Sequence, residues 1–261
     1  MINELIEDRV IEETSFNEGD YMNSVFLVLK KDSTPEDPKF RLILNMKSLN
    51  KNFVKLTHHK IHSLSTCLDL MEKDCYMGSV DLKSAFHSIP MDPSYTKYLK
   101  FQVEGKVFKY LVLPMGFRDS PRLFCKILKP VLAHLRKKGF ISSIYIDDFY
   151  IQGATYIECL ENLKATLELL KSLGFKISEK SELVPSRSLQ HLGFILNSSN
   201  MSISLSEKKR LHIKELICKA LKVKLLTIKE LASLIGTLVA SFPGVQRGML
   251  FYRELEFLKN C

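Results

Sequence analysis

The sequence lacks any segment that could cross a membrane, because no apolar run approaches the roughly 18 residues that a spanning helix needs. Its acidic N-terminus does not resemble a secretion signal. Repeats and low-complexity tracts are also missing, and a composition of 46% apolar and 26% charged residues excludes disorder, collagen and fibres. We therefore expect a folded intracellular protein, in the cytoplasm or the nucleus, with no membrane partner.

Paired cysteines are missing as well, since none of the six cysteines belongs to a CxxC motif. A chain of 261 residues buries enough surface to fold without disulfide bonds, so we expect reduced, mostly buried thiols. His58, His59 and His62 lie close to Cys67, which invites a zinc interpretation. The remaining ligand spacing matches no common zinc site, and we predict none.

Positive charge is abundant. Thirty-eight Lys and Arg residues against 29 Asp and Glu give a net charge of +9 and an isoelectric point near 9.1. Such a surplus suits a polyanionic partner such as a nucleic acid, although many unrelated proteins are equally basic.

The apolar pattern predicts an α+β protein. Gly and Pro mark the turns, and Thr227 with Glu230 forms a capping box at the start of a late helix. A split βαβ arrangement with helices on one face of an antiparallel sheet accounts for this order. The predicted strands are 24–29, 40–44, 76–82, 98–103, 107–112, 144–151 (with an Asp-Asp turn inside it), 175–178 and 191–196, and the predicted helices are 120–138, one that ends at Gly174, 206–222 and 227–240.

Acidic residues end two of these predicted strands. Asp147 and Asp148 stand between residues that otherwise favour a buried sheet, and taken alone the pair is most simply a hairpin turn. Asp81, however, also ends an apolar strand. Three carboxylates at the ends of adjacent strands would form an oxygen site suited to Mg²⁺, because a cation relieves their repulsion. The implied chemistry is phosphoryl or nucleotidyl transfer with two metal ions.

Five sequence blocks resemble, in order and spacing, those of reverse transcriptases. The blocks are 81–86 (DLKSAF), 113–121 (LPMGFRDSP), 145–148 (YIDD), 174–175 (GF) with Lys180, and 191–194 (HLGF). The resemblance implies a right-hand polymerase in which a ferredoxin-like palm lies between fingers and a helical thumb. It assigns 1–75 mainly to the fingers with a hairpin at 24–44, 76–93 and 113–196 to the palm, 94–112 to a fingers hairpin inserted in the palm, and 200–261 to the thumb.

The resemblance also implies an RNA-directed DNA polymerase, a nucleotidyltransferase that adds deoxynucleotides to a primer 3′-hydroxyl on an RNA or DNA template. Asp81 and Asp147 would bind both of two Mg²⁺ ions, with Mn²⁺ as a substitute, and Asp148 would complete the acidic site. Lys180 resembles the lysine proposed to protonate pyrophosphate, although Lys176 and Lys180 are equally consistent with surface charges.

Five further residues are similar to those that contact the incoming deoxynucleoside triphosphate. Lys30 and Arg41 flank the 24–44 hairpin loop, where their charges would contact phosphates. Phe86 occupies the sugar-gate position, where a ring leaves no room for a 2′-hydroxyl; the alternative is a core aromatic. Met115 stands where many relatives carry glutamine and is otherwise ordinary packing, and Gly116 would let the backbone approach the nucleotide closely.

Other residues resemble nucleic-acid contacts. Leu192, Gly193 and Phe194 look like the primer grip, and Tyr145 stands beside the paired acids. Lys208 and Lys209, on a helix of the expected thumb, would contact the duplex backbone; the alternative is an ordinary solvated face.

The segments HSIPM, KYLKF and LKPVLAHLRKKGF look most like DIRS-like tyrosine-recombinase retrotransposons, with gypsy-like elements next. Such enzymes belong to polyproteins that also contain ribonuclease H and a recombinase or integrase, for which this chain has no room. Two alternatives stay open: an inactive or domesticated reverse-transcriptase-like protein that only binds nucleic acid, and an RNA-dependent RNA polymerase, which Phe86 disfavours.

Overall fold

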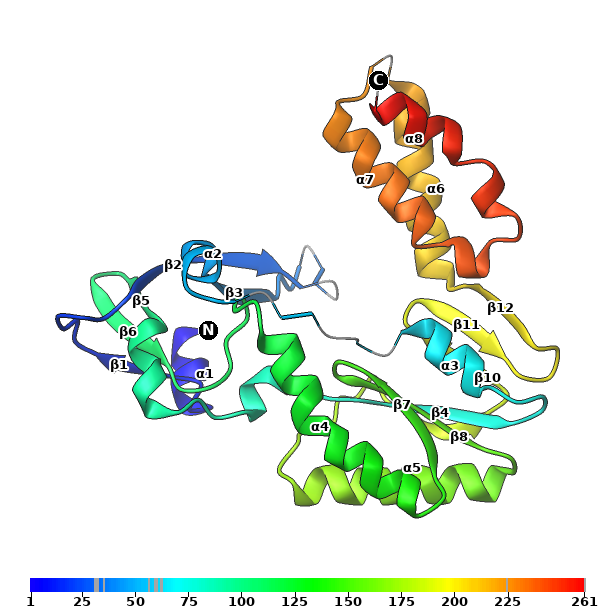
Figure 1. The fold of residues 1–261 in the computed structure, drawn as a ribbon, viewed down its shortest axis with the longest axis horizontal. Helices are drawn as coiled ribbons and strands as arrows, with labels where there is room; N and C mark the ends of the chain where they lie inside the picture. The colour runs from blue at the N-terminus through cyan, green and yellow to red at the C-terminus, as the bar shows by residue number, and fades with distance from the viewer. Residues whose placement is uncertain are drawn as a thin grey trace.

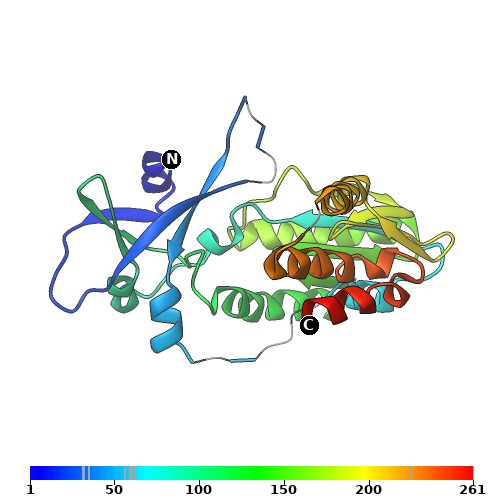
Figure 2. The same cartoon turned by 90° about the horizontal axis from the view of Figure 1, so that it is seen from above.

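The computed structural model describes residues 1–30, 33–34, 36–55, 57–58, 61, 63–223 and 225–260, except the side chain of Asn260. They form an N-terminal lobe, a central lobe and a C-terminal helical lobe (Figure 1). Figure 2 shows a long hairpin of the N-terminal lobe that extends away from the other strands. Lys31, Asp32, His59, His62 and Cys261 lie outside the described residues.

A four-stranded antiparallel sheet forms the central lobe, in the order β7 (Ile141–Tyr145), β8 (Asp148–Gly153), β4 (Tyr76–Asp81) and β9 (Glu182–Ser186). The helices α4 (Ser120–Lys137) and α5 (Tyr156–Ser172) cover one face (Figure 1). Because side chains alternate along a strand, Val80, Phe149 and Ile151 enter the core under these helices. Each fully buried side chain of this size contributes about 1.5–3 kcal/mol.

The opposite face of the same sheet is covered as well. The sequence predicted helices on one face and did not predict this second layer. Met77 and Tyr150 pack there against a second cluster. That cluster includes residues of α3 (Leu64–Leu70) and of a three-stranded sheet made of β10 (Ser188–His191), β11 (Phe194–Asn197) and β12 (Ser202–Leu205). The central sheet is thus fixed on both faces.

The N-terminal lobe has its own five-stranded sheet, in the order β1 (Ile11–Thr14), β6 (Lys106–Tyr110), β5 (Lys100–Val103), β2 (Met22–Leu29) and β3 (Phe40–Asn45). The helices α1 (Ile2–Glu7) and α2 (Lys47–Asn52) and the 3₁₀ helix η2 (Pro93–Tyr98) flank it. A buried ion pair, 2.6 Å between the Lys100 ammonium and the Asp20 carboxylate, ties β5 to the loop before β2.

The helical lobe consists of α6 (Glu207–Lys222), α7 (Ile228–Val239), the 3₁₀ helices η3 (Phe242–Gly244) and η4 (Gly248–Leu250), and α8 (Arg253–Asn260). The capping box of Thr227 and Glu230 forms as predicted, with both reciprocal hydrogen bonds present. Sequence analysis did not anticipate α8.

Several local predictions are corrected. Segment 175–178 forms only an isolated bridge, Leu82 to Ile177, because it precedes β9 and faces the chain just after the end of β4. Segment 191–196 is two strands joined by a turn. At the start of α4, the hydroxyl of Ser120 donates to the carbonyl oxygen of Pro114 at 2.8 Å.

The cysteines among the described residues are all free thiols, and Cys67, Cys75 and Cys159 are buried. Within the same described part of the chain, none of the helices combines the length and apolar character of a membrane span.

Candidate active site

Strand pairing brings the three acids to one corner of the central sheet. Asp81, the last residue of β4, lies directly opposite Asp148, the first residue of β8. The backbone N–H of Leu82 donates to the carbonyl oxygen of Asp147 at 3.0 Å, which places that residue beside both. Because Val80 and Phe149 face the helices, Asp81 and Asp148 face the other side of the sheet.

The turn that presents Asp147 is strained. The two-residue loop between β7 and β8 is Ile146–Asp147, so the expected Asp-Asp turn is shifted by one residue. Ile146 has a φ of +57°, a left-handed conformation that β-branched residues rarely adopt. Such a conformation costs about 1–3 kcal/mol and persists where packing enforces it. Here the Ile146 side chain packs against the central core.

The electrostatics of the corner favour a bound cation. Burial, followed by repulsion from the neighbouring acids, raises the pKa of Asp147 above its ordinary value. Burial and the charge of Asp148 likewise raise the pKa of Asp81. Arg41 opposes the shift at Asp147, and Lys180 opposes the shift at Asp81, so both cations lie within electrostatic reach.

Two serines that sequence analysis missed, Ser178 and Ser181, hold the end of β4 by hydrogen bonds. The hydroxyl of Ser181 accepts the backbone N–H of Asp81 at 3.0 Å, and the backbone N–H of Ser178 donates to the carbonyl oxygen of Asp81 at 2.8 Å. A side-chain hydrogen bond from Ser178 lowers the pKa of the Asp81 carboxyl and opposes the effect of burial. These contacts also place Lys180 beside Asp81.

His191 is a second residue whose place sequence analysis did not foresee. Its buried Nδ1 lies 3.5 Å from Oδ1 of Asp148, too far for a good hydrogen bond but close enough for an ion pair. Burial alone would lower the pKa of His191, but Asp148 and Cys67 outweigh it and raise the pKa to about 9. Asp148 therefore contacts a cationic side chain rather than pointing wholly toward Asp81.

The three predicted metal ligands thus lie at the same corner of the sheet, but their side chains do not converge on one point. Among the described residues, no three His, Cys, Asp or Glu side chains converge closely enough to hold an ion as they stand. The donor chemistry nevertheless fits Mg²⁺: carboxylate oxygens, partly buried, with mutual repulsion that a cation would relieve.

Phe86 lies in the short 3₁₀ helix η1 (Ala85–Ser88), directly after β4. The preceding Ser84 has a φ of +52°, which turns the chain sharply at the end of the strand. The Phe86 ring is half-buried and meets Phe124 edge-on, with centroids 5.5 Å apart. It is therefore anchored in the core and still partly exposed.

The structure gives a reason for glycine at position 116 that differs from the expected approach to a nucleotide. A Cβ at this position would lie 1.9 Å from the carbonyl oxygen of Leu44, so the loop must approach the backbone of β3 closely. The backbone N–H of Leu44 donates to the carbonyl oxygen of Met115 at 3.1 Å. Asn50 of α2, another residue that sequence analysis missed, donates from Nδ2 to the carbonyl oxygen of Gly116 at 2.8 Å.

Lys30 and Arg41 are exposed and lie near the free end of the β2–β3 hairpin, where Val28 pairs with Arg41. The positive charges of both lower the pKa of His87, which follows Phe86, although burial of the imidazole is the larger cause. Both cations therefore lie within electrostatic reach of His87, and Arg41 also lies within reach of Asp147.

The Leu192–Gly193 turn joins β10 to β11, and both residues have positive φ, the signature of a tight two-residue hairpin. Lys209 packs against this hairpin, with its Nζ 3.7 Å from the ring centroid of Phe194 and a hydrogen bond of 3.0 Å to the carbonyl oxygen of Ala240. Lys209 thus joins the helical lobe to the turn, whereas Lys208 and Tyr145 are exposed.

A mixed five-stranded sheet, an antiparallel central sheet with an acidic corner, and a helical lobe define a polymerase fold, and comparison with solved structures agrees. The foamy viral protease–reverse transcriptase in complex with double-stranded DNA superposes with a TM-score of 0.80 at 24% identity, covering 99% of this chain and 42% of that one. The family model for reverse transcriptase (RNA-dependent DNA polymerase) matches residues 28–196. The chain belongs to the reverse transcriptase family.

Curated relatives are polyproteins. The Gag-Pol polyprotein of avian reticuloendotheliosis virus is 30% identical over 193 residues, which cover 70% of this chain and 16% of the relative. The retrovirus-related Pol polyprotein from transposon opus of Drosophila melanogaster is 25% identical over 202 residues, which cover 77% of this chain and 19% of the relative. The chain therefore spans less than a fifth of these two relatives.

Proposed function

We propose that the chain is the polymerase core of a retroelement, which adds deoxynucleotides to a primer 3′-hydroxyl on an RNA template. The pairing of Asp81 with Asp148, beside the turn that holds Asp147, is the observation that supports this most. In this proposal the N-terminal lobe, including β5 and β6, acts as fingers, the central lobe as palm and the helical lobe as thumb.

Asp81 and Asp147 would each bind both of two Mg²⁺ ions, or Mn²⁺ in their place, and Asp148 would complete the site by a side-chain rotation away from His191. When bound, the ions would activate the attacking hydroxyl and neutralise the leaving pyrophosphate. Arg41 and Lys30 would contact the triphosphate, and Lys180 would supply a proton beside Asp81.

Other residues are proposed to contact the incoming nucleotide or the nucleic acid. Met115 and Gly116, fixed to β3 by backbone contacts, would line the nucleotide pocket. The Leu192–Phe194 turn and Tyr145 would contact the primer strand, and Lys208 would contact a phosphate.

We also propose that the polyprotein is DIRS-like and works in the cytoplasm or the nucleus. The sequence segments that resemble this group support the first point, and the lack of a membrane-spanning helix among the described residues is consistent with the second. Ribonuclease H and a recombinase or integrase would then lie elsewhere in the polyprotein.

Extension of a DNA primer on an RNA template, with Mg²⁺ and deoxynucleotides, tests the function directly. We expect extension that EDTA stops and that requires the template. Tight binding of the primer–template without extension would favour the binding-only alternative, and a preference for ribonucleotides would favour an RNA polymerase.

Substitution of the proposed sugar gate, Phe86→Ala, is expected to admit ribonucleotides. Opening the space below the sugar should reduce discrimination against them by about 10–100-fold, the range typical of a steric contact. Single-nucleotide incorporation with matched deoxy- and ribonucleotides measures this ratio. Phe86→Leu, which keeps most of the side-chain volume, is the control, and unchanged discrimination in Phe86→Ala would dismiss the gate.

The two neighbouring lysines of α6 should behave differently. Lys208→Gln is expected to weaken duplex binding and to lower the slope of log affinity against log salt by about 1, since one phosphate contact is lost. Lys209→Gln should instead lower the melting temperature, because its ammonium holds the turn and the end of α7. Salt titrations and melting curves of both variants separate these roles; equal salt slopes would contradict the assignment to Lys208.

A further inference from the structure

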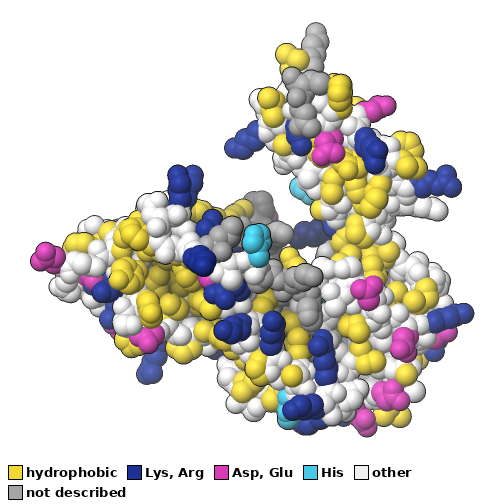
Figure 3. All heavy atoms as spheres, in the orientation of Figure 1, with side chains coloured by type: hydrophobic (Ala, Val, Ile, Leu, Met, Phe, Trp, Pro, Cys, Tyr) yellow, Lys and Arg dark blue, Asp and Glu magenta, His cyan; other side chains and the backbone are white. Residues whose placement is uncertain are grey.

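His191 connects the β10–β11 hairpin to the acidic corner. It is the last residue of β10, pairs with Phe194 across the hairpin, and directly precedes the left-handed Leu192. The backbone N–H of Ser206 fixes the turn by donating to the carbonyl oxygen of Gly193 at 3.1 Å. Figure 3 shows hydrophobic side chains gathered where the helical lobe meets the central lobe, which is where β11 and β12 lie in Figure 1.

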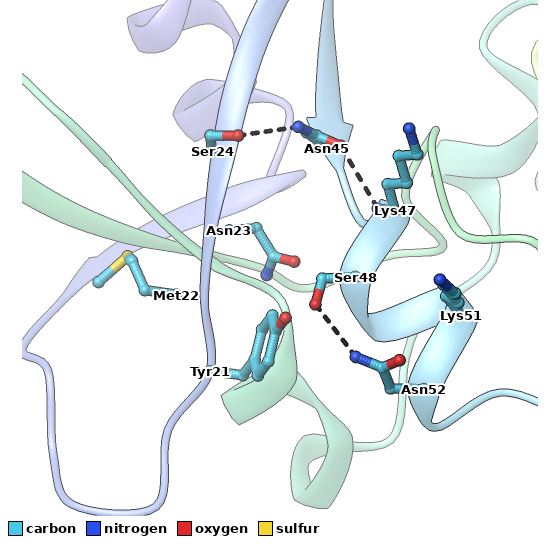
Figure 4. Close-up of a pocket in the computed structure, with 9 residues that line it drawn as sticks. All are labelled: Tyr21, Met22, Asn23, Ser24, Asn45, Lys47, Ser48, Lys51 and Asn52. Atoms are coloured by element: carbon cyan, nitrogen blue, oxygen red, sulfur yellow. Dashed lines mark hydrogen bonds between the residues drawn. The ribbon is translucent and has the colours of Figure 1, made fainter.

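The imidazole of His191 lacks the hydrogen bonds that a buried polar group normally has. His191 is 2% exposed, and among the described residues neither ring nitrogen has a hydrogen-bond partner. Asn23, which lines a hollow of about 550 Å³ beside α2 (Figure 4), lacks a partner only for Oδ1, because its Nδ2 donates to two backbone carbonyl oxygens. Buried polar groups without partners are rare and often belong to functional sites. In His191 the Nδ1 atom faces a carboxylate instead, 3.5 Å from Oδ1 of Asp148.

Strand β8 fixes the position of this imidazole. Asp148 and Tyr150 share one face of β8, because side chains alternate along a strand. The Tyr150 ring is fully buried, and its hydroxyl donates to Oε1 of Gln152 at 2.7 Å. Its centroid lies 5.9 Å from that of the His191 ring. The imidazole is thus packed against β8 beside the Asp148 carboxylate.

The Asp148 carboxylate cannot face His191 and complete the acidic corner at the same time. Asp148 pairs with Asp81 across β4 and β8, so its backbone is in place for the corner. Within the described part of the chain, however, the acids do not converge closely enough to hold an ion while the carboxylate lies toward His191. The two orientations of Asp148 therefore define two states, and a ligand that needs one of them shifts the population toward it.

We propose that His191 is a positioning residue that holds Asp148 out of the corner, so that the site is completed only when a divalent cation draws this carboxylate away from the imidazole. The inference rests on the proposed metal site of the polymerase function. Because the cation must overcome the preference of Asp148 for the other state, the contact with His191 weakens cation binding.

Binding of Mn²⁺ to the protein without nucleic acid tests the proposal independently of catalysis. His191→Leu removes the polar contact and is expected to strengthen Mn²⁺ binding about 10-fold, within the range typical of coupling inside one protein. His191→Asn places an amide N–H near the position of Nδ1 and should bind Mn²⁺ as wild type does. Tyr150→Phe, the matched control beside the imidazole, should also leave the affinity unchanged. Electron paramagnetic resonance of free Mn²⁺ measures the affinities, with Asp147→Asn as the reference that lacks the site.

A double-mutant cycle separates positioning from charge alone. Removal of a cationic side chain would by itself strengthen Mn²⁺ binding, and that effect would persist without the Asp148 carboxylate. In the Asp148→Asn background, where Asp81 and Asp147 still offer carboxylates, His191→Leu should therefore gain far less affinity than in the wild-type background. Equal gains in both backgrounds, or no gain in the wild-type background, would overturn the proposal.

A measurement on the wild-type chain covers the case in which His191→Leu does not fold. Mg²⁺ is diamagnetic, so the NMR signals of the imidazole stay visible when it binds. The His191 signal, identified by its contact with the Tyr150 ring, is expected to shift with Mg²⁺ in the wild type and to stay in place in Asp148→Asn. An unchanged wild-type signal at saturating Mg²⁺ would overturn the proposal.

The same data distinguish failure of this inference from failure of the proposed function. Mn²⁺ binding that Asp147→Asn does not reduce would overturn both the metal site and the role of His191. A chain that binds Mn²⁺ as expected in every variant but extends no primer would contradict only the polymerase function.

Discussion

Asp147→Asn is expected to reduce primer extension by about 10³-fold or more and, at the same time, to stabilise the metal-free protein. The activity falls because the proposed metal ions would contribute several kcal/mol of charge stabilisation to the transition state, and each 1.4 kcal/mol changes the rate about tenfold. Stability rises because burial and repulsion from Asp81 and Asp148 penalise the charged Asp147 carboxylate. Removing such a penalty commonly yields about 0.5–2 kcal/mol.

The pH dependence of this stabilisation follows from the direction of the shift. A carboxyl whose pKa is raised in the folded state binds its proton more tightly there than in the unfolded chain, so its destabilising effect is present above the folded pKa and disappears as the pH falls below it. The difference in melting temperature between Asp147→Asn and wild type should therefore shrink from pH 7 toward pH 4. Millimolar Mg²⁺ should shrink it at pH 7 as well, by stabilising the wild type.

Asp69→Asn is the matched control, because Asp69 is an exposed acid on α3. It should leave both extension and melting temperature unchanged. Extension that survives in Asp147→Asn would reject the metal assignment, and a lower melting temperature in that variant would reject the electrostatic account of the corner.

Gly116→Ala is expected to destabilise the protein by about 3 kcal/mol, since a backbone contact and a positive φ both oppose the new side chain. A Cβ would lie 1.9 Å from the carbonyl oxygen of Leu44, and the φ of Gly116 is +113°. The melting temperature should fall by about 6–12 °C, and nucleotide binding should weaken because the loop can no longer lie against β3.

Gly105→Ala separates the two causes. Gly105 also has a positive φ, +81°, but nothing lies within 4 Å of the position that its Cβ would take. It should therefore cost only about 1 kcal/mol, from backbone strain alone. Equal melting temperatures for the two variants would show that the approach to Leu44 does not limit stability.

The parts of the fold that the sequence predicted well are those with local causes. Apolar runs that flank a segment with two prolines define the β2–β3 hairpin, and a Gly-containing turn defines the β5–β6 hairpin. The apolar strands around Asp81 and Asp147 place both acids at or beside strand ends. The capping residues at Thr227 define the start of α7 in the same way.

The parts that the sequence did not predict depend on contacts between distant segments. Nothing near Gly116 indicates that Leu44 lies against it, and Ser181 is 100 residues from the strand end that it holds. Leu192 has no local preference for a positive φ, so the pattern predicts one strand where the structure has a hairpin. In each case the tertiary environment overrides the local preference.

Lys209 and Ser206 together attach the start of α6 to the β10–β11 turn, and this attachment has a mechanical consequence. One ammonium touches the ring after the β10–β11 turn and the last carbonyl region of α7, and the backbone N–H of Ser206 donates to the carbonyl oxygen of Gly193. A rotation of the helical lobe about its base would therefore move the β10–β11 hairpin as well. If a primer–template duplex lies against α6 as proposed, a change in its width would then move the turn that is proposed to contact the primer strand.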